Sequence, residues 1–221
     1  MPETSPFLKA QFSVRDEFGK LIETTDEEEA KKENIFSPEA KYGSSLIILD
    51  DSRLIKGFRD ALQNAKIGEQ QEIKIPKAEG FGERKQELVV LLPQKKFEEA
   101  KISPQAGMVV DMDGQRGKVL SISGGRVQVD LNHELAGKDV MYKFKVLERI
   151  EAKEGKINAL LEEQLDAGIK AKAIPEGVQI IAPQETMKKE NYLQGKYSII
   201  QAALQFIPDI GKIQWIEEFS K

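Results

Sequence analysis

Apolar and polar residues alternate along the first part of the chain as they do in half-buried strands. Residues 7–14 form an apolar, β-branched run, residues 16–20 supply a turn glycine, and the stretch to residue 25 continues as a second strand. A β-type run at 46–49 and the alternating residues 71–76 add two more. The pattern therefore predicts four strands before residue 77.

Two helices are predicted between these strands. The segment 25–32 has the cap residue Thr25 followed by good helix formers, which favours a short solvated helix. The segment 54–62 places Phe58 and Leu62 four residues apart, a spacing typical of an amphipathic helix. This first region therefore combines strands with short helices.

The chain then changes to closely spaced short strands, which are predicted at 87–92, 108–112, 116–122 and 126–131. The pairs Asp113-Gly114 and Gly124-Gly125 are tight-turn signals that predict hairpins. Residues 93–100 form a short helix with proline near its first position. These elements predict a small, mainly β unit, after which 141–150 is one more alternating strand.

The last seventy or so residues form a third pattern. The elements predicted there are a helix that includes 157–165, a hairpin of 168–173 and 177–181, a helix over 191–207 and a strand over 210–219. This α-β-β-α-β order is large enough for an α+β domain. The apolar strand near Trp215 is an edge with which a second copy of the chain could pair.

Composition narrows the classes of function. The 33 Lys and Arg residues nearly balance 37 Asp and Glu residues, so the net charge of −4 gives no electrostatic reason to expect nucleic acid or an anionic membrane as a partner. No apolar run reaches the ~20 residues of a membrane span, and the start lacks the pattern of a secretory signal. The absence of cysteine excludes disulfides and thiolate chemistry, and we expect a cytoplasmic protein.

Two segments at the edges of the short-strand region resemble one family. The segment Leu131–Val140 holds the only histidine and lies between two β-type runs, and Gly80-Phe-Gly-Glu83 stands upstream of it. Together they resemble the junction of the FK506-binding proteins (FKBPs), which are peptidyl-prolyl isomerases. The resemblance is to the subgroup, including bacterial SlyD and longer archaeal proteins, that carries a second domain inserted in the first.

The resemblance implies an α+β fold in three parts. An FKBP-like antiparallel sheet wraps on a short helix, a small all-β domain (the insert-in-flap domain) interrupts it, and a C-terminal α-β-β-α-β domain follows. The implied boundaries are 1–83 with 139–150, then 84–138, then 151–221. The C-terminal part resembles the extension of archaeal long-type members, which suggests a homodimer.

The resemblance also implies an isomerase pocket built from scattered residues. The run Leu54–Phe58 matches the element that floors the family's pocket, with Ile55 supplying a backbone contact to the ligand. Tyr142 takes the place of a pocket phenylalanine. The implied pocket residues are Phe12, Ile22, Glu23, Leu54, Ile55, Phe58, Phe81 and Tyr142.

Four of these positions depart from the family pattern. Phe12 and Phe81 each stand where a tyrosine is usual, so each lacks a hydroxyl. Ile22 replaces an aromatic wall, and Glu23 is one methylene longer than the usual aspartate. Because a lost hydrogen-bonding group costs about 0.5–1.5 kcal/mol, we expect weak to moderate isomerase activity and poor binding of macrolide inhibitors.

The implied reaction suits a chain with little catalytic equipment. Uncatalysed rotation about an X-Pro bond crosses a barrier of ~18–20 kcal/mol, and the planar amide is more dipolar than the twisted one, so an apolar pocket favours twisting. Such a pocket needs no metal or cofactor, and none is expected. The alternatives are that these apolar residues are only core, or that the pocket has decayed and the protein is a non-catalytic chaperone.

The inserted region is expected to bind unfolded chains close to the pocket. Its apolar candidates are Leu88, Phe97, Val109 and Met112, together with Val90 and Leu92. The alternative for Val90, Leu92 and Val109 is that they form the core of the region. His133 is expected in a helix cap or a hydrogen-bonded loop, because a lone histidine is a poor basis for a metal site. The expected partners are unfolded proteins and proline-containing peptides.

Overall fold

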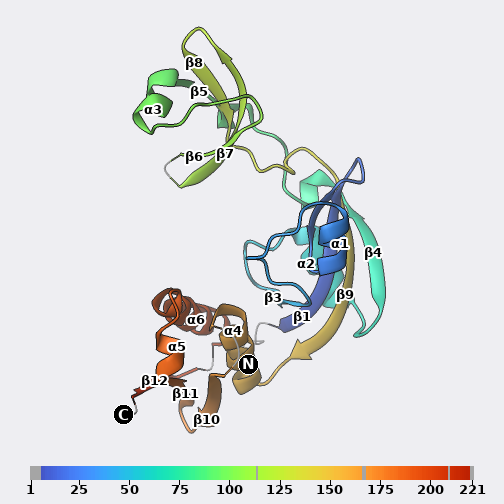
Figure 1. Ribbon diagram of the computed structural model, residues 1–221. Coiled ribbons are helices and arrows are strands. Elements are labelled where there is room, and N and C mark those ends of the chain that lie inside the picture. The colour runs from blue at the N-terminus through green and yellow to red at the C-terminus, as the bar shows by residue number, and fades with distance from the viewer. Residues whose placement is uncertain (1–5, 113, 166–167, 209, 220–221) are drawn as a thin grey trace. The chain divides into compact units, whose positions relative to one another are not determined.

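The computed structural model describes residues 6–112, 114–165, 168–208 and 210–219. The chain divides into two compact units, one made of Met1–Lys74 with Met141–Lys221 and one of Ile75–Val140. Figure 1 shows the elements of each unit. The finer division into three domains with boundaries at 84–138 and 151–221 stays a prediction.

A five-stranded sheet forms the centre of the first unit (Figure 1). Its strands are β1 (Phe7–Asp16), β2 (Leu21–Thr24), β3 (Ser45–Ile48), β4 (Gln70–Ile75) and β9 (Val140–Ile150). The order is β2-β1-β9-β4, and β3 pairs with the other part of β1. β1 is antiparallel to both β2 and β3. The strands predicted from alternation are therefore present, each within about two residues of its expected bounds.

The short helix α1 (Glu27–Lys32) follows β2, and its cap differs from the expected one. The side chain of Asp26, not Thr25, accepts the hydrogen bond from the Glu29 N–H. The Thr25 hydroxyl instead bonds the backbone of Phe12 on β1. A carboxylate is a stronger acceptor than a hydroxyl for the free N–H groups of a helix start, which explains the shift by one residue.

The helix α2 (Lys56–Asn64) packs on the sheet through Phe58 and Leu62, the two residues predicted for its buried face. It begins two residues later than expected, because Ile55 has an extended backbone (φ −62°, ψ 142°). At the other end of the helix, the Arg149 guanidinium on β9 donates to the carbonyl oxygens of Leu62, Gln63 and Ala65 at 2.9–3.1 Å. These hydrogen bonds hold the end of α2 against β9 of the sheet.

The second unit is a four-stranded sheet of order β5-β8-β7-β6 with helix α3. Its elements are η1 (Lys77–Glu79), η2 (Gln86–Leu88), β5 (Val89–Pro93), α3 (Gln94–Glu99), β6 (Val109–Met112), β7 (Gln115–Ser123) and β8 (Arg126–Asp130). Gly124 and Gly125 both have positive φ, so they make the predicted tight turn between β7 and β8. Valines of β6, β7 and β8 form the core.

The core of this unit corrects one expectation from the sequence. Phe97 was predicted on an exposed binding surface, but it is 2% exposed and packs with Val119 and Val127. The short helix α3 needs one large apolar side chain to cover the sheet, and Phe97 is its only one. Val90 and Leu92 pack against the same core, as their alternative reading predicted.

The C-terminal segment folds as helices on a three-stranded sheet of order β10-β11-β12. Its elements are α4 (Lys153–Leu165), β10 (Lys170–Ile174), β11 (Gly177–Pro183), α5 (Gln184–Met187), α6 (Tyr192–Phe206) and β12 (Lys212–Glu218). β12 runs parallel to β11. These elements occur in the predicted order, and among them only the four-residue helix α5 was not predicted.

A small polar network fixes β12 to α6. The Trp215 indole N–H donates to the Tyr192 hydroxyl (2.9 Å), which donates to Glu217 (2.8 Å). Lys196 also bonds Glu217, at 2.8 Å. Burial, together with the bond to Glu217, raises the pKa of Tyr192 to about 12. The hydroxyl therefore stays protonated and keeps its place in the network.

The C-terminal segment shares a core with the start of the chain. Phe7 of β1 and Ile150 of β9 belong to the same buried cluster as Ile157 and Ile180. Lys9 pairs with Glu162 at 2.7 Å, and Lys41 donates to the carbonyl oxygens near the end of α4. A cation suits the negative end of a helix. These contacts join the segment to the first unit.

Candidate active site

Four aromatic rings meet between α2 and the sheet. Phe58 of α2 lies with its ring centroid 4.3 Å from that of Tyr142, 5.3 Å from Phe144 and 5.7 Å from Phe12. Phe12 and Tyr142 are 6.4 Å apart. The edge-to-face and tilted arrangements are those that aromatic quadrupoles favour. The structure thus brings together Phe12, Phe58 and Tyr142, three of the residues predicted for the pocket.

Phe144 was not predicted for this cluster, although the sequence contains a signal for it. Successive side chains of a strand point to opposite faces, so Phe144 shares a face with Tyr142. The burial of β9 follows this rule, since Tyr142 and Phe144 are buried and Lys143 is exposed. The period of two, applied to β9 after Tyr142, would have identified it.

Leu54 and Ile55 lie half-buried in the segment that leads into α2. Arg59, on the first turn of that helix, donates through Nη2 to the carbonyl oxygens of Asp51 (3.0 Å) and Leu54 (3.1 Å). Its Nε is buried and has no hydrogen-bond partner among the residues that the structure describes. The guanidinium therefore holds the backbone that precedes Ile55 in one position.

Glu23 reaches the same face of the sheet as the aromatic cluster. It is paired with Val14 in the β1–β2 register, and residues directly opposite each other share a face. Val14 in turn shares a face with Phe12, two residues away on β1. Glu23 is exposed, yet partial loss of solvent around its carboxyl group raises its pKa. Ile22 lies half-buried beside it on β2.

Phe81 is described with the second unit, where its ring stacks on His133. The ring centroids are 4.2 Å apart and the planes differ by 7°. His133 also accepts a hydrogen bond at Nδ1 from the Leu135 N–H (3.2 Å), as a residue of a hydrogen-bonded loop does. Burial lowers the pKa of His133. The expected place of Phe81 in the pocket stays a prediction.

Hydrogen bonds and an ion pair connect two segments of the second unit, residues 82–85 and residues 130–137. Asn132 bonds both the N–H and the carbonyl oxygen of Lys85 at 2.9 Å. The Gly137 N–H donates to Gly82 (2.7 Å), and Arg84 forms an ion pair with Asp130. These bonds explain why the segment around His133, rich in polar residues, has a defined fold.

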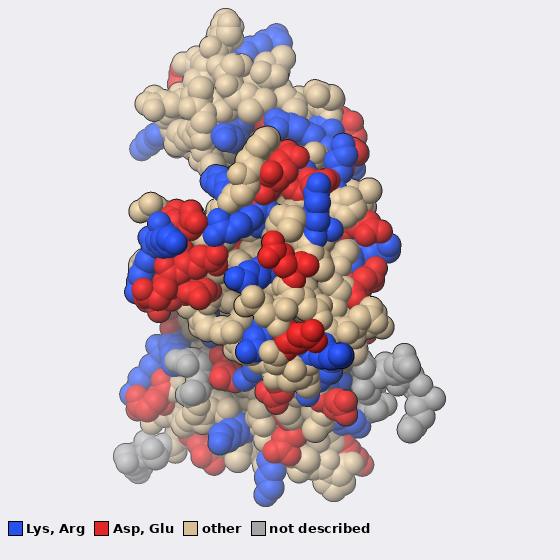
Figure 2. All heavy atoms as spheres, turned by 90° about the vertical axis from the view of Figure 1, so that its right-hand side faces the viewer, with Lys and Arg blue, Asp and Glu red and all other residues tan. Residues whose placement is uncertain are grey.

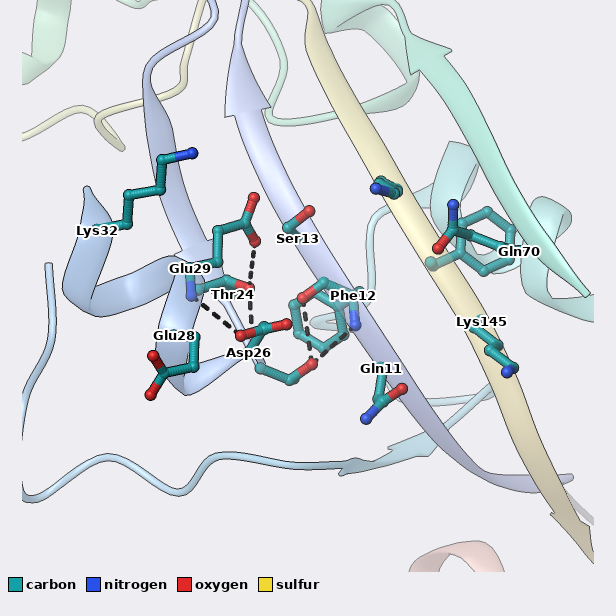
Figure 3. A pocket seen from close by; sticks show the side chains of 13 residues that line it. Gln11, Phe12, Ser13, Thr24, Asp26, Glu28, Glu29, Lys32, Gln70 and Lys145 are labelled. Carbon is teal, nitrogen blue, oxygen red and sulfur yellow. Dashed lines mark hydrogen bonds between the residues drawn. The ribbon is translucent and has the colours of Figure 1, made fainter. Parts of the chain in front are cut away.

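A polar pocket of about 550 Å³ lies on the face of the sheet to which the residues alternating with the aromatic ones point, and Phe12 and Phe144 also contribute to its lining (Figure 3). Gln11 and Ser13 of β1 and Lys145 of β9 line it, and these residues alternate with the aromatic ones. Glu28 and Glu29 of α1 close its other side. The Thr24 hydroxyl bonds Glu29 there at 2.7 Å. This pocket has charged walls and is not the apolar crevice that the sequence predicted.

The candidates in the inserted region differ in their exposure. Val109 is 62% exposed, so the alternative that placed it in the core is wrong. Leu88 is half-buried, and the side chain of Met112 lies outside the described part of the structure. Exposed apolar residues that the sequence did not single out are Leu91, Met108, Leu120 and Ile122.

Among the described residues, neither a patch of one charge in the face shown nor a group of metal ligands indicates a second functional site. Lys and Arg are interspersed with Asp and Glu over the face shown in Figure 2. Within the described ranges, no three His, Asp or Glu residues gather as a metal site would require. None of the described helices is long and apolar enough to cross a membrane.

Comparisons with known proteins identify the family. The profile of the FKBP-type peptidyl-prolyl cis-trans isomerases matches residues 18–112, and that of the FKBP26 IF domain matches residues 90–135. A short-type peptidyl-prolyl cis-trans isomerase of Methanocaldococcus jannaschii is 36% identical over 128 residues, which are 58% of this chain and 82% of that protein.

Two bacterial relatives, both named FKBP-type peptidyl-prolyl cis-trans isomerase SlyD, are more distant. The Helicobacter pylori protein is 31% identical over 51% of this chain and 62% of its own length. The Treponema pallidum protein is 25% identical over 73% and 85%. The chain belongs to the FKBP-type peptidyl-prolyl cis-trans isomerases and carries the FKBP26-type inserted domain. The resemblance read from the sequence is confirmed, and the protein is a peptidyl-prolyl cis-trans isomerase.

The aromatic cluster gives this reaction a physical basis. Rotation about the X-Pro bond weakens amide resonance, so the twisted amide is less dipolar than the planar one. An apolar environment such as that around Phe12, Phe58 and Tyr142 stabilises the planar dipole less than water does. A prolyl bond held there would therefore cross a lower barrier without a nucleophile or proton transfer.

Proposed function

We propose that this isomerase acts on X-Pro bonds of polypeptides that are still folding, and that its inserted unit captures them. The aromatic cluster of Phe12, Phe58 and Tyr142, with Glu23 on the same face, supports a prolyl site. The lack of cysteine supports a cytoplasmic place of action.

The observation that carries the capture proposal is an apolar edge of the inserted unit. β5 and β6 are the edge strands of its sheet. Leu91 on β5 is 59% exposed, and Val109 on β6 and Met108 before it are exposed as well. An edge strand offers unpaired backbone groups to an extended chain, and exposed apolar side chains add affinity. Capture by a unit of the same chain would raise the local concentration of substrate for the prolyl site.

Substituting the β6 edge tests this proposal. The variant Met108→Ser with Val109→Ser removes two exposed side chains and leaves the buried Val110 in place. We expect the catalysed refolding of an unfolded, proline-limited protein to slow by roughly 5- to 30-fold, the factor that 1–2 kcal/mol represents. Turnover of a prolyl tetrapeptide should not change, because a tetrapeptide is too short to use the edge.

Ile67→Ser is the matched control, since Ile67 is also an exposed apolar residue but belongs to the first unit. It should leave both assays unchanged. A double variant that slows both substrates equally, or neither, would disprove capture through β6.

We also propose that two copies of the chain associate through the C-terminal segment. Leu193, Tyr197 and Leu204 of α6 are exposed and recur on one helical face. β12 is an edge of its sheet. The variant Leu193→Glu with Leu204→Glu should convert a dimer to a monomer in light scattering coupled to gel filtration, and Ile67→Glu should not. A wild-type chain that is monomeric at high concentration would refute the proposal.

A further inference from the structure

Tyr142 is buried, yet its hydroxyl has no hydrogen-bond partner in the part of the chain that the structure describes. The residue is 6% exposed, and its ring lies next to that of Phe58 and near that of Phe12. No hydrogen bond to the Tyr142 hydroxyl occurs among the residues that the structure describes, and the oxygen is not sealed from the surface. A buried tyrosine hydroxyl normally finds a partner in the protein. This one is therefore available to a group that enters from outside.

The surroundings of Tyr142 keep the hydroxyl protonated. Burial is the main cause that raises its pKa, and the nearby charge of Glu23 adds to it. The carboxyl group of Glu23 forms no ion pair or hydrogen bond with any residue in the described ranges. The hydroxyl is thus a hydrogen-bond donor throughout the neutral pH range, and Glu23 is a nearby acceptor group.

The cluster around Tyr142 lacks hydroxyls elsewhere. Phe12, on the next strand, has its ring centroid 6.4 Å from that of Tyr142 and carries no polar atom. Phe58 and Phe144 are equally apolar. Tyr142 is therefore the one aromatic side chain of the four that can bond a peptide.

We propose that the Tyr142 hydroxyl donates a hydrogen bond to a carbonyl oxygen of the bound prolyl peptide and so orients it at the aromatic cluster. This role rests on the proposed action on X-Pro bonds. It makes Tyr142 a catalytic residue of this chain at a position where the family resemblance implied only an apolar wall. The hydroxyls that are absent at Phe12 and Phe81 are then replaced by one at a different point of the pocket.

Tyr142→Phe removes the hydroxyl and keeps the ring. We expect kcat/KM for a prolyl tetrapeptide to fall about tenfold, as loss of one hydrogen bond predicts, in an assay without a helper protease. The thermal unfolding midpoint should be unchanged or slightly higher, because no bond within the protein is lost. Tyr42→Phe, a change in a loop of the same unit, is the matched control and should keep full activity.

A rescue variant separates a bond to substrate from a packing effect. Adding Phe12→Tyr to Tyr142→Phe returns a hydroxyl to the same cluster from the neighbouring strand. We expect it to restore most of the lost kcat/KM. If the loss persists in the double variant, the hydroxyl is not the missing group and the proposal fails.

The wild-type chain is measured first. If it does not isomerise the tetrapeptide, the proposed function fails. If it does and Tyr142→Phe is equally active, the role of Tyr142 alone is refuted.

Discussion

Single residues of the pocket differ in how well the sequence revealed them. Phe12, Phe58 and Tyr142 were predicted and lie together, because aromatic residues on adjacent elements pack wherever an apolar face is available. In the inserted unit, Phe97 was predicted on the surface but is buried, whereas Val109 is exposed and its alternative place in the core is wrong. The charged neighbours of Phe97 suggested exposure, and only the fold shows that α3 covers the sheet. Val110, not Val109, has the inward position on β6.

The raised pKa of Glu23 predicts a pH-dependent stability. Because loss of solvent raises this pKa in the folded protein above that of the unfolded chain, folding favours the protonated form. The contribution is therefore fully present below the unfolded pKa, about 4.3, and is lost as the pH rises through the folded pKa. Glu23→Gln, which never ionises, should raise the unfolding temperature at pH 7.

The gain should shrink as the pH is lowered towards about 4, where wild-type Glu23 is also protonated. Thermal unfolding followed by circular dichroism at both pH values measures it. Glu17→Gln, an exposed residue of the β1–β2 turn, is the control and should show little effect at either pH. The account would be contradicted if the stability of Glu23→Gln relative to wild type were lower at pH 7 than at pH 4.

At the scale of elements, the alternation of apolar and polar residues predicted the strands well, whereas the ends of the helices were predicted less well. Strands with one buried face have a period of two that the sequence shows directly, as in β4 and β9. The ends of helices depend on which side chain satisfies the free backbone groups. Asp26 caps α1, and the contact of Arg59 with Leu54 keeps the first residues before α2 extended. Neither contact can be read from spacing alone.

The clamp on α2 predicts a loss of stability and activity together. Arg149→Met keeps the aliphatic stem but removes the three hydrogen bonds to the end of the helix. We expect the free energy of unfolding to fall by about 2 kcal/mol, the range for bonds to a charged group. Because α2 carries Phe58, prolyl turnover should fall as well. Urea unfolding and the tetrapeptide assay measure the two effects.

Arg53→Met is the matched control. The Arg53 side chain is 88% exposed, and among the described residues its one ion-pair partner is Asp51. Exposed pairs contribute about 0–1 kcal/mol. Equal stability losses in the two variants would show that the bonds from Arg149 do not hold α2 in place.

At the scale of the whole molecule, the chain combines a unit that carries the aromatic cluster, which is the proposed prolyl site, with an inserted unit that carries apolar edge strands. The order of most elements and a separate small β unit could be predicted because turn glycines and changes of period mark them in the sequence. The insertion of that unit in the first domain was implied by the family resemblance. The exposed apolar face of α6, formed by Leu193, Tyr197 and Leu204, could not be predicted. The helical pattern does not show which apolar residues the rest of the fold covers.

The central claim is that the apolar cluster lowers the barrier of prolyl rotation in a folding chain. The most direct measurement is the slow refolding phase of a protein limited by a non-native X-Pro bond, followed by fluorescence without protease at increasing concentrations of this protein. The rate constant should rise in proportion to the isomerase concentration, at amounts well below that of the substrate. No acceleration at any concentration, with aggregation still suppressed, would instead identify a chaperone that binds unfolded chains without catalysis.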